Sequence, residues 1–416
     1  MTKSLGEKKV RNHIPQDLAL LVLSKLPLKS LKRFGCVHKT WSLLFENPNF
    51  ITMFRTNFIS ISRSYYDDTS LILHQVVIKG RTASFLHLLS SQSFENRLKL
   101  DLPTPLQQED PIFYIQGSST NNGTLCLSNG DSSTLVLWNP TTDEVNVIPP
   151  SPMESVSPYW DSLISFYGFG YDHVRDDYKI IRCLDYFRLS EEDLFNLNLP
   201  EDAQSEEIFY DYVWEIYSLR CNTWEKLDVD IPANSKQYIL YTNDGICHWL
   251  GENNDQRWLV SFDLSSYAYF TTNTPITIPT RDPSFDFEVP NFNYGMAPRS
   301  VVLNVVVLNG SIALISWYPK TTTFDISILG ELGVSESWTK LFTIGPLPFY
   351  IERPIGAGRS GDIFFRKKDK KIVCYDLSTH MVEELGLEEA PSNRIIYKKK
   401  WFLKSNKSFV GFLVLN

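Results

Sequence analysis

Two short stretches of the sequence carry residue types that could do chemistry. Residues 356–361, GAGRSG, match the Gly-x-Gly-x-x-Gly pattern of phosphate-binding loops. Such a loop leads into a helix, whose free amides and dipole hold the phosphate. Here the loop leads into the apolar run DIFF at residues 362–365, which is typical of a strand. We therefore expect no nucleotide to bind at this loop.

The second stretch is a group of carboxylates, Asp172, Asp176 and Asp177, beside His173. Carboxylates at this spacing could bind calcium or transfer protons. Aspartates also cap tight β turns, because their side-chain oxygens accept hydrogen bonds from nearby backbone amides. Apolar runs that continue on both sides favour the turn interpretation.

No other catalytic pattern is present: the sequence has no Gly-x-Ser-x-Gly, no Walker loop and no His-Glu-x-x-His. The six cysteines are scattered without metal-binding spacing, which indicates reduced and mostly buried thiols. We therefore expect no catalytic residues, no metal and no cofactor. An enzyme whose catalytic residues converge only in three dimensions remains an alternative.

Composition and charge describe a globular chain that does not bind nucleic acid. Its 416 residues are 43% hydrophobic and 21% charged, with a net charge of -8. Neutralising phosphates requires a clustered positive surface. The basic runs, residues 366–368 and 398–400, are short, and we expect both to be solvated hairpin turns.

The sequence also predicts no membrane segment. The N-terminal charges are followed by no apolar stretch, so they form no secretory signal. The longest apolar region, residues 301–316, is interrupted by Asn304, Asn309 and Gly310, whereas a membrane span needs about 20 apolar residues. We expect a cytoplasmic and/or nuclear protein.

From about residue 70 onward, short apolar runs separated by Gly, Pro, Asn and Asp predict strands. A repeat is visible: a tight turn at Gly123, Gly245, Gly310 or Gly361 opens a strand. About fifteen residues later come an aromatic residue, Asn or Asp, and two hydroxyl residues, as in WNPTT, FDLSS and YDLST. Their polar side chains can cap a turn.

Five such units are recognisable, and the strands before the first unit together with those at the C-terminus can supply a sixth. Each unit is too small to bury its apolar face alone, so the units must pack in a ring or a stack. The fold class is therefore mainly β with a small N-terminal α-helical domain, and the leading architecture is a β-propeller of six blades. An open pair of sandwiches is the alternative.

Two insertions interrupt the repeats. Residues 189–211 contain eight acidic residues and no basic one, and residues 275–292 are rich in proline. Both are expected to be exposed, and each could serve recognition or act as a solvated spacer.

The head of the chain differs from the rest, because residues 17–26 form a leucine-rich helix that is apolar nearly all round. Pro15 suits its start, and Pro27 ends it or begins a second helix. About forty helical residues cannot stabilise a core alone, so they must pack on the propeller or on another protein. Physical reasoning leaves both options open.

Residues 14–50 resemble an F-box, with its opening Ile-Pro, leucine-rich helix, second Leu-Pro and spaced Leu, Val, Trp and Phe. The rest of the chain resembles the F-box-associated, kelch-like domain of plant F-box proteins, most closely in GFGYDHVRDDYKIIR and LWNPTTDE. The resemblance implies a flexible N-terminus at 1–10, an F-box at 11–55, a linker at 56–70 and a kelch-like β-propeller at 71–416.

The resemblance further implies a substrate receptor of an SCF-type ubiquitin ligase. The F-box would bind a Skp-type adaptor and, through it, cullin and a RING subunit, while the propeller would hold a protein target. A ligase-independent scaffold is an alternative. The residues expected to bind the adaptor are Ile14, Pro15, Leu18, Val22, Leu23, Leu26, Pro27, Leu31, Val37 and Trp41.

Overall fold

The computed structural model describes most of the chain, apart from the first residues, several loops and most of the C-terminal segment. The described residues are 15–37, 41, 43–63, 71–79, 81–90, 96–107, 112–118, 123–130, 132–154, 160–189, 212–231, 241–243, 245–252, 256–276, 301–349, 351–358, 361–369, 371–385 and 410–414. Side chains of β24 and of the last residues of α2 lie outside the description.

The N-terminal part folds into the helices α1 (Gln16–Leu23), α2 (Leu28–Val37) and α4 (Pro48–Arg63). A short 3-10 helix, η1 (Leu44–Glu46), precedes α4. We call this unit, residues 15–63, the helical head. Its first two helices confirm the predicted helices on either side of Pro27. Helix α4 was not predicted, and it continues unbroken across residue 55, where the F-box was expected to give way to a linker.

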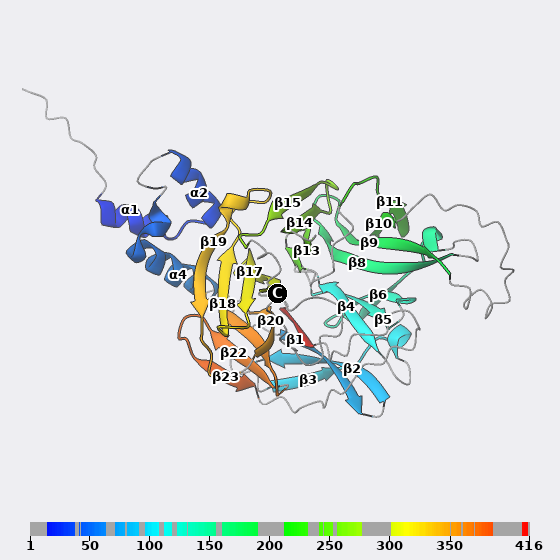
Figure 1. The fold of residues 1–416 in the computed structure, drawn as a ribbon. Coiled ribbons are helices and arrows are strands. Elements are labelled where there is room, and N and C mark those ends of the chain that lie inside the picture. Colours follow the sequence, from blue (N-terminus) through cyan, green and yellow to red (C-terminus); the bar gives the residue numbers. More distant parts are fainter. Residues whose placement is uncertain are drawn as a thin grey trace, which may run out of the picture.

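The remaining described elements form six four-stranded antiparallel sheets (Figure 1). Blade 1 contains β24 (Val410–Val414), β1 (Leu71–Lys79), β2 (Arg81–Ser90) and β3 (Asn96–Leu100). Blade 2 contains β4 (Phe113–Ser118), β5 (Leu125–Asn129), β6 (Leu135–Asn139) and β7 (Glu144–Ile148). Blade 3 contains β8 (Trp160–Asp172), β9 (Asp177–Arg188), β10 (Tyr212–Ser218) and β11 (Thr223–Lys226).

Blades 4 to 6 follow in chain order. Blade 4 contains β12 (Tyr241–Asn243), β13 (Ile246–Glu252), β14 (Arg257–Asp263) and β15 (Tyr269–Asn273). Blade 5 contains β16 (Val302–Leu308), β17 (Ser311–Tyr318), β18 (Thr323–Ile328) and β19 (Thr339–Ile344). Blade 6 contains β20 (Ile351–Ala357), β21 (Asp362–Lys367), β22 (Ile372–Asp376) and β23 (Val382–Leu385). The six-bladed propeller is confirmed, and the sandwich alternative is wrong.

The ring closes through its two ends, as the sequence predicts. Strand β24, at the C-terminus, pairs antiparallel with β1, with Leu71 opposite Val414 and Gln75 opposite Val410. Blade 1 is therefore assembled from both ends of the propeller. This closure ties the first strand to the last and leaves no open end in the ring.

The repeated sequence pattern corresponds to repeated turns. Gly123, Gly245, Gly310 and Gly361 all have positive φ, which the tight turn after the first strand requires. The second pattern caps turns, because the Asp263 carboxylate accepts bonds from two backbone amides at 2.7 and 3.3 Å. Asn139 and Asp376 do the same in their own blades.

Two sequence expectations for loops have clear outcomes. Of residues 356–361, Gly356 and Ala357 end strand β20 and Gly361 directly precedes strand β21, so the described residues there lead into a strand, as predicted. The basic run at 366–368 is less simple. Arg366 is buried within β21, so the expectation of a solvated turn is wrong for this residue, although Lys368 is exposed. The run at 398–400, and nearly all of both insertions, lie outside the described residues.

Blades 3 and 4 pack closely where β8 meets β13. A Cβ placed on Gly168 in β8 would lie 2.3 Å from the Cys247 sulfur in β13. Four of the five cysteines with described side chains are buried and Cys221 is exposed, all with free thiols. The predicted reduced and mostly buried thiols are therefore present in this part of the chain.

Two histidines inside the propeller make its stability depend on pH. Burial lowers the pKa of His74 to about 4 and that of His248 to about 3. In the unfolded chain both titrate near pH 6.5, so below that pH the unfolded state binds more protons. Between about pH 6 and pH 4, stability should fall by about 1.4 kcal/mol per pH unit for each histidine.

The test is the urea midpoint of unfolding at pH 7, 6 and 5. His248 and Ser261 share a hydrogen bond, with 2.9 Å between Nδ1 and Oγ. An asparagine at residue 248 can therefore keep a polar partner for Ser261. The variant His248→Asn should lose about half of the pH slope, since one of the two histidines remains. An unchanged slope in this variant would show that His248 is not the group responsible.

Candidate functional site

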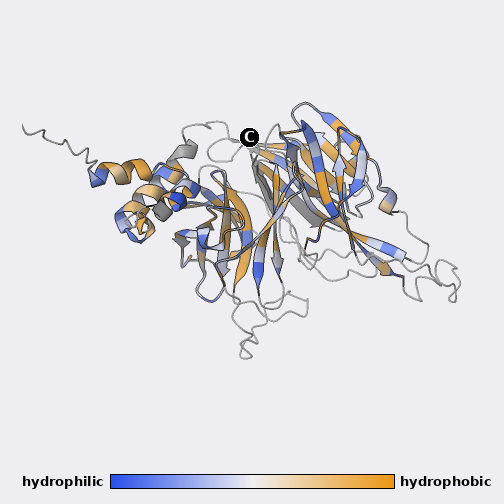
Figure 2. Cartoon of the chain, turned by 90° about the horizontal axis from the view of Figure 1, so that it is seen from above, coloured by the Kyte–Doolittle hydropathy of each residue, from blue (hydrophilic) through white to orange (hydrophobic). Residues whose placement is uncertain are grey.

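The helical head rests on blades 5 and 6 through one side of α4 (Figures 1 and 2). Asn47 begins this helix, and its side-chain oxygen accepts bonds from the amides of residues 49 and 50 at 3.0 and 3.3 Å. Phe50 and Phe54 lie one helical turn apart and are both buried, as is Ile59 further along the helix. They are buried in the same apolar cluster as residues of β16 to β22, so the head and the propeller share one core.

Polar contacts fix the head at two further points. Arg33 in α2 pairs with Glu331 in the loop between β18 and β19 at 2.9 Å, and Lys29 lies 3.6 Å from the same carboxylate. The hydrogen bond from Arg33 lowers the pKa of Glu331. Asn309, in the first turn of blade 5, donates to the backbone oxygen of Phe58 at 2.8 Å. Contacts from both α2 and α4 therefore hold the head on the propeller.

The side of α1 that faces away from the propeller is apolar and exposed. Leu18, Leu21 and Val22 have exposed fractions of 50%, 44% and 55%. Phe34 in α2 and Leu43 before η1 are exposed by 38% and 54%. We call these five side chains the exposed apolar row. Leu18, Leu21 and Val22 lie within about one helical turn of one another, and exposed apolar side chains that cluster in this way are typical of interaction surfaces.

The ten residues that the sequence singles out are distributed over both sides of the head. Pro15, Leu18, Val22 and Pro27 are exposed. Leu23 and Leu31 are buried in the core shared with the propeller, and Leu26 and Trp41 are partly buried against it. Ile14 and the Val37 side chain lie outside the described residues.

Sequence reasoning omitted three members of the exposed apolar row, which are Leu21, Phe34 and Leu43. A signal existed for Leu21, because it lies one helical turn from Leu18. For Phe34 the helical spacing was visible, and its ring meets Trp41 edge to face at 5.8 Å. The sequence could not show that the propeller leaves these side chains uncovered.

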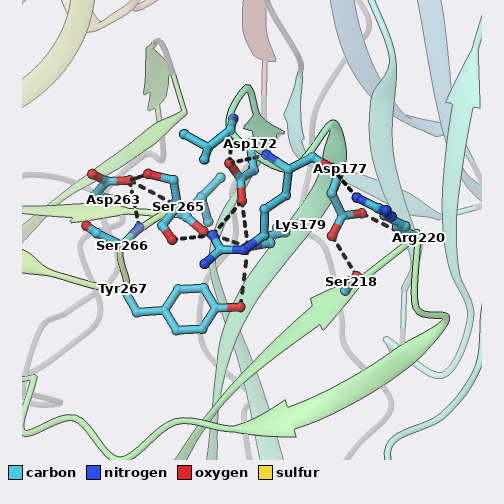
Figure 3. Close-up of polar contacts among 12 residues, drawn as sticks. Asp172, Asp177, Lys179, Ser218, Arg220, Asp263, Ser265, Ser266 and Tyr267 are labelled. Atoms are coloured by element: carbon cyan, nitrogen blue, oxygen red, sulfur yellow. Dashed lines mark hydrogen bonds and ion pairs between the residues drawn. The ribbon is translucent and has the colours of Figure 1, made fainter.

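The aspartate group at residues 172–177 is a structural joint between blades 3 and 4 (Figure 3). Asp172 ends β8 and accepts bonds from the amides of Val174 and Arg175 at 2.9 and 3.2 Å, which confirms the predicted turn cap. Its other oxygen pairs with the buried ammonium of Lys179 at 2.8 Å.

Lys179 connects blade 3 to blade 4. Its ammonium also donates to the backbone oxygen of Leu264 at 2.9 Å and to the Tyr267 hydroxyl at 3.3 Å, both in blade 4. Burial alone would raise the pKa of Asp172, but hydrogen bonds from Lys179 and Arg175 lower it overall. The carboxylate is thus occupied in holding blades together. The described residues contain no group of His, Cys, Asp or Glu placed to hold a metal ion.

A ring of six blades that carries a helical head packed on blades 5 and 6 defines a class of propeller proteins with an N-terminal helical unit. Comparison with known families agrees with this class. The chain matches the F-box domain over residues 12–52 and the F-box associated beta propeller domain over residues 84–404. The chain belongs to the F-box proteins that carry an F-box associated β-propeller.

Similar proteins are found in plants. The F-box protein CPR1 of Arabidopsis thaliana is 25% identical over 392 residues, which cover 91% of this chain and 86% of that protein. An F-box/kelch-repeat protein of the same plant is 23% identical over 363 residues, covering 83% of this chain and 82% of that protein. A chain in the crystal structure of a nidogen/laminin complex matches with a TM-score of 0.38 at 10% identity, over 76% of this chain and 91% of that one. None of the helices in the described part of the chain has the length and hydropathy of a membrane span.

Proposed function

We propose that this protein is the substrate-recognition subunit of an SCF-type E3 ubiquitin ligase. The helical head binds a Skp-type adaptor, which connects it to cullin and a RING subunit, and the propeller presents a protein target for ubiquitination. The observation that carries the proposal is the exposed apolar row on a head whose other side is already buried. Membership of the F-box family supports the identity of the partner.

The two sides of the head have different roles in this proposal. Leu18 and Val22, together with Leu21, Phe34 and Leu43, contact the adaptor directly, because their apolar surface remains in water. Leu23 and Leu31 position the helices from inside, since they are buried against the propeller. Burying apolar surface contributes about 25 cal/mol per Å², so a few half-exposed large side chains can drive specific association.

The protein contributes no covalent chemistry in this role. Its effect is proximity, because a target held on the propeller stays close to the conjugating enzyme that the adaptor recruits. The proposal keeps the F-box at 11–55 and the propeller at 71–416, with α4 bridging them. It places the protein in the cytoplasm and/or the nucleus.

The double variant Leu18→Ala/Val22→Ala should weaken adaptor binding. Each substitution removes apolar contact worth about half that of a fully buried side chain, about 1 kcal/mol. Together the two substitutions should raise the Kd for the adaptor roughly 30-fold. Titration calorimetry of the full chain with a recombinant Skp-type adaptor measures this change. Gel filtration with added cullin and RING subunit then shows whether the larger complex forms.

Val147→Ala in β7 is a matched control, because Val147 has the same exposed fraction as Val22, 55%, but lies in blade 2. It should bind the adaptor as tightly as the wild-type chain. Equal binding by the double variant and the wild type would place the adaptor elsewhere. Adaptor binding without recruitment of cullin would favour a ligase-independent scaffold.

A further inference from the structure

Blade 3 is built from unusually long strands. Strands β8 and β9 contain 13 and 12 residues, whereas β13 and β16 contain 7 each. At the far end of this hairpin, residues 160–164 pair with residues 184–188. Asp185 and Leu184 also pair with Tyr212 and Val213 at the start of β10. We call these residues, with 212 and 213, the blade 3 extension.

One face of the blade 3 extension is covered by the protein itself. Leu184, Tyr186 and Val213 are buried there against Met153 and Trp160. The Tyr186 hydroxyl donates to the backbone oxygen of Met153 at 2.8 Å. This face belongs to the packed interior and holds the extension in place.

The other face is apolar and exposed. Since side chains alternate along a strand, Leu163, Phe187 and Tyr212 all project away from the covered side. Their exposed fractions are 37%, 36% and 41%. Large aromatic side chains that remain in water are the residue type most often found at the centre of protein interfaces.

Carboxylates alternate with these apolar side chains across the strands. Leu163 lies opposite Asp185, and Asp185 lies opposite Tyr212, so the three are neighbours in one row. In the next row Asp161 lies opposite Phe187. Both aspartates are exposed. Arg188, a nearby basic residue, lies opposite Trp160 in the register of β8 and β9, so its side chain projects toward the covered face.

The blade 3 extension lies across the ring from the helical head (Figure 1). The head contacts the first turn of blade 5 at Asn309, whereas the corresponding turn of blade 3, residues 173–176, is at the opposite end of β8 from residue 160. The extension therefore points away from the side of the ring that the head uses. The chain that continues from β9, residues 189–211, adds eight acidic residues and no basic one.

We propose that the exposed face of the blade 3 extension is the docking surface for the target, and that it fits a target segment in which arginine or lysine alternates with apolar residues. A guanidinium can pair with Asp161 while it lies against the Phe187 ring, which is opposite Asp161 in the sheet. The apolar residues of the segment cover Leu163. The net charge of -8 favours the approach of such a segment. The proposal rests on the substrate-receptor role proposed above.

The test uses the full chain bound to its Skp-type adaptor and a fluorescein-labelled peptide that alternates arginine with leucine and phenylalanine. Two comparison peptides carry glutamate at every arginine position or serine at every apolar position. Fluorescence anisotropy should show binding of the first peptide only. Phe187→Ala and Asp161→Asn should each weaken it by about tenfold.

Phe270→Ala is the matched control, because Phe270 in β15 is an aromatic exposed by 44% outside this face. It should leave peptide affinity unchanged. Equal binding of the serine peptide, or full binding by Phe187→Ala, would overturn the proposed surface, as would absence of binding. Adaptor capture is measured on the same samples: its loss in the wild-type chain contradicts the receptor role, whereas a peptide failure with intact capture contradicts the docking surface alone.

Discussion

Replacing Phe54 by alanine is expected to reduce the free energy that holds the helical head closed on the propeller by about 3–5 kcal/mol, the usual cost of removing a buried phenylalanine. Phe54 is only 3% exposed and lies in the core shared by the head and the propeller. Its ring also meets Phe45 edge to face at 5.6 Å. Hydrogen exchange of the α4 amides, converted to a free energy of opening, measures this loss.

Phe34→Ala is the control for this prediction, because it removes the same side chain from the outer side of the same head. Phe34 is more than a third exposed, so its loss should change the opening of α4 by less than about 1 kcal/mol. Phe34→Ala should instead weaken binding of the adaptor, since Phe34 belongs to the exposed apolar row. A small effect of Phe54→Ala on α4 would mean that the propeller does not support the head.

The second large effect is expected at the joint between blades 3 and 4. Lys179→Met should destabilise the propeller by about 3–5 kcal/mol, because it leaves the buried Asp172 carboxylate without its closest cation. The backbone oxygen of Leu264 and the Tyr267 hydroxyl lose their donor in the same step. The midpoint of urea unfolding at neutral pH measures the change.

Arg175→Ala removes the other cation from the same carboxylate and serves as the comparison. The Arg175 side chain is half exposed and its ion pair with Asp172 is 3.1 Å long, so water replaces much of what it contributes. A loss below about 1 kcal/mol is expected. Equal losses in the two variants would show that burial of Lys179 is not what makes the joint strong.

The propeller was predictable from sequence because its signals are local and repeated. Glycines with positive φ occupy the first turns of blades 2, 4, 5 and 6, and the capping side chains at Asn139, Asp263 and Asp376 act within a few residues. The pairing of β24 with β1 could be inferred because five visible units left strands over at both ends. These features depend on chain geometry that the residues themselves dictate.

The rest could not be predicted, because it depends on contacts between segments far apart in the chain. Helix α1 is apolar nearly all round, so periodicity could not separate the buried Leu23 from the exposed Leu18 and Val22. Helix α4 carries phenylalanines at residues 50, 54 and 58, yet the face that buries them belongs to blades 5 and 6. The partners of Lys179 in blade 4 are 85 and 88 residues away.

Hydrogen exchange of the full chain, with and without a Skp-type adaptor, tests most directly whether the head uses one side for the propeller and the other for the adaptor. We predict that the adaptor slows exchange in residues 15–26 and around Leu43, while exchange in α4 and in β17 to β19 stays unchanged. Absence of slowing in α1 would contradict the proposed adaptor site. Faster exchange in α4 and blade 5 would also contradict it, because the head would then leave the propeller when it binds.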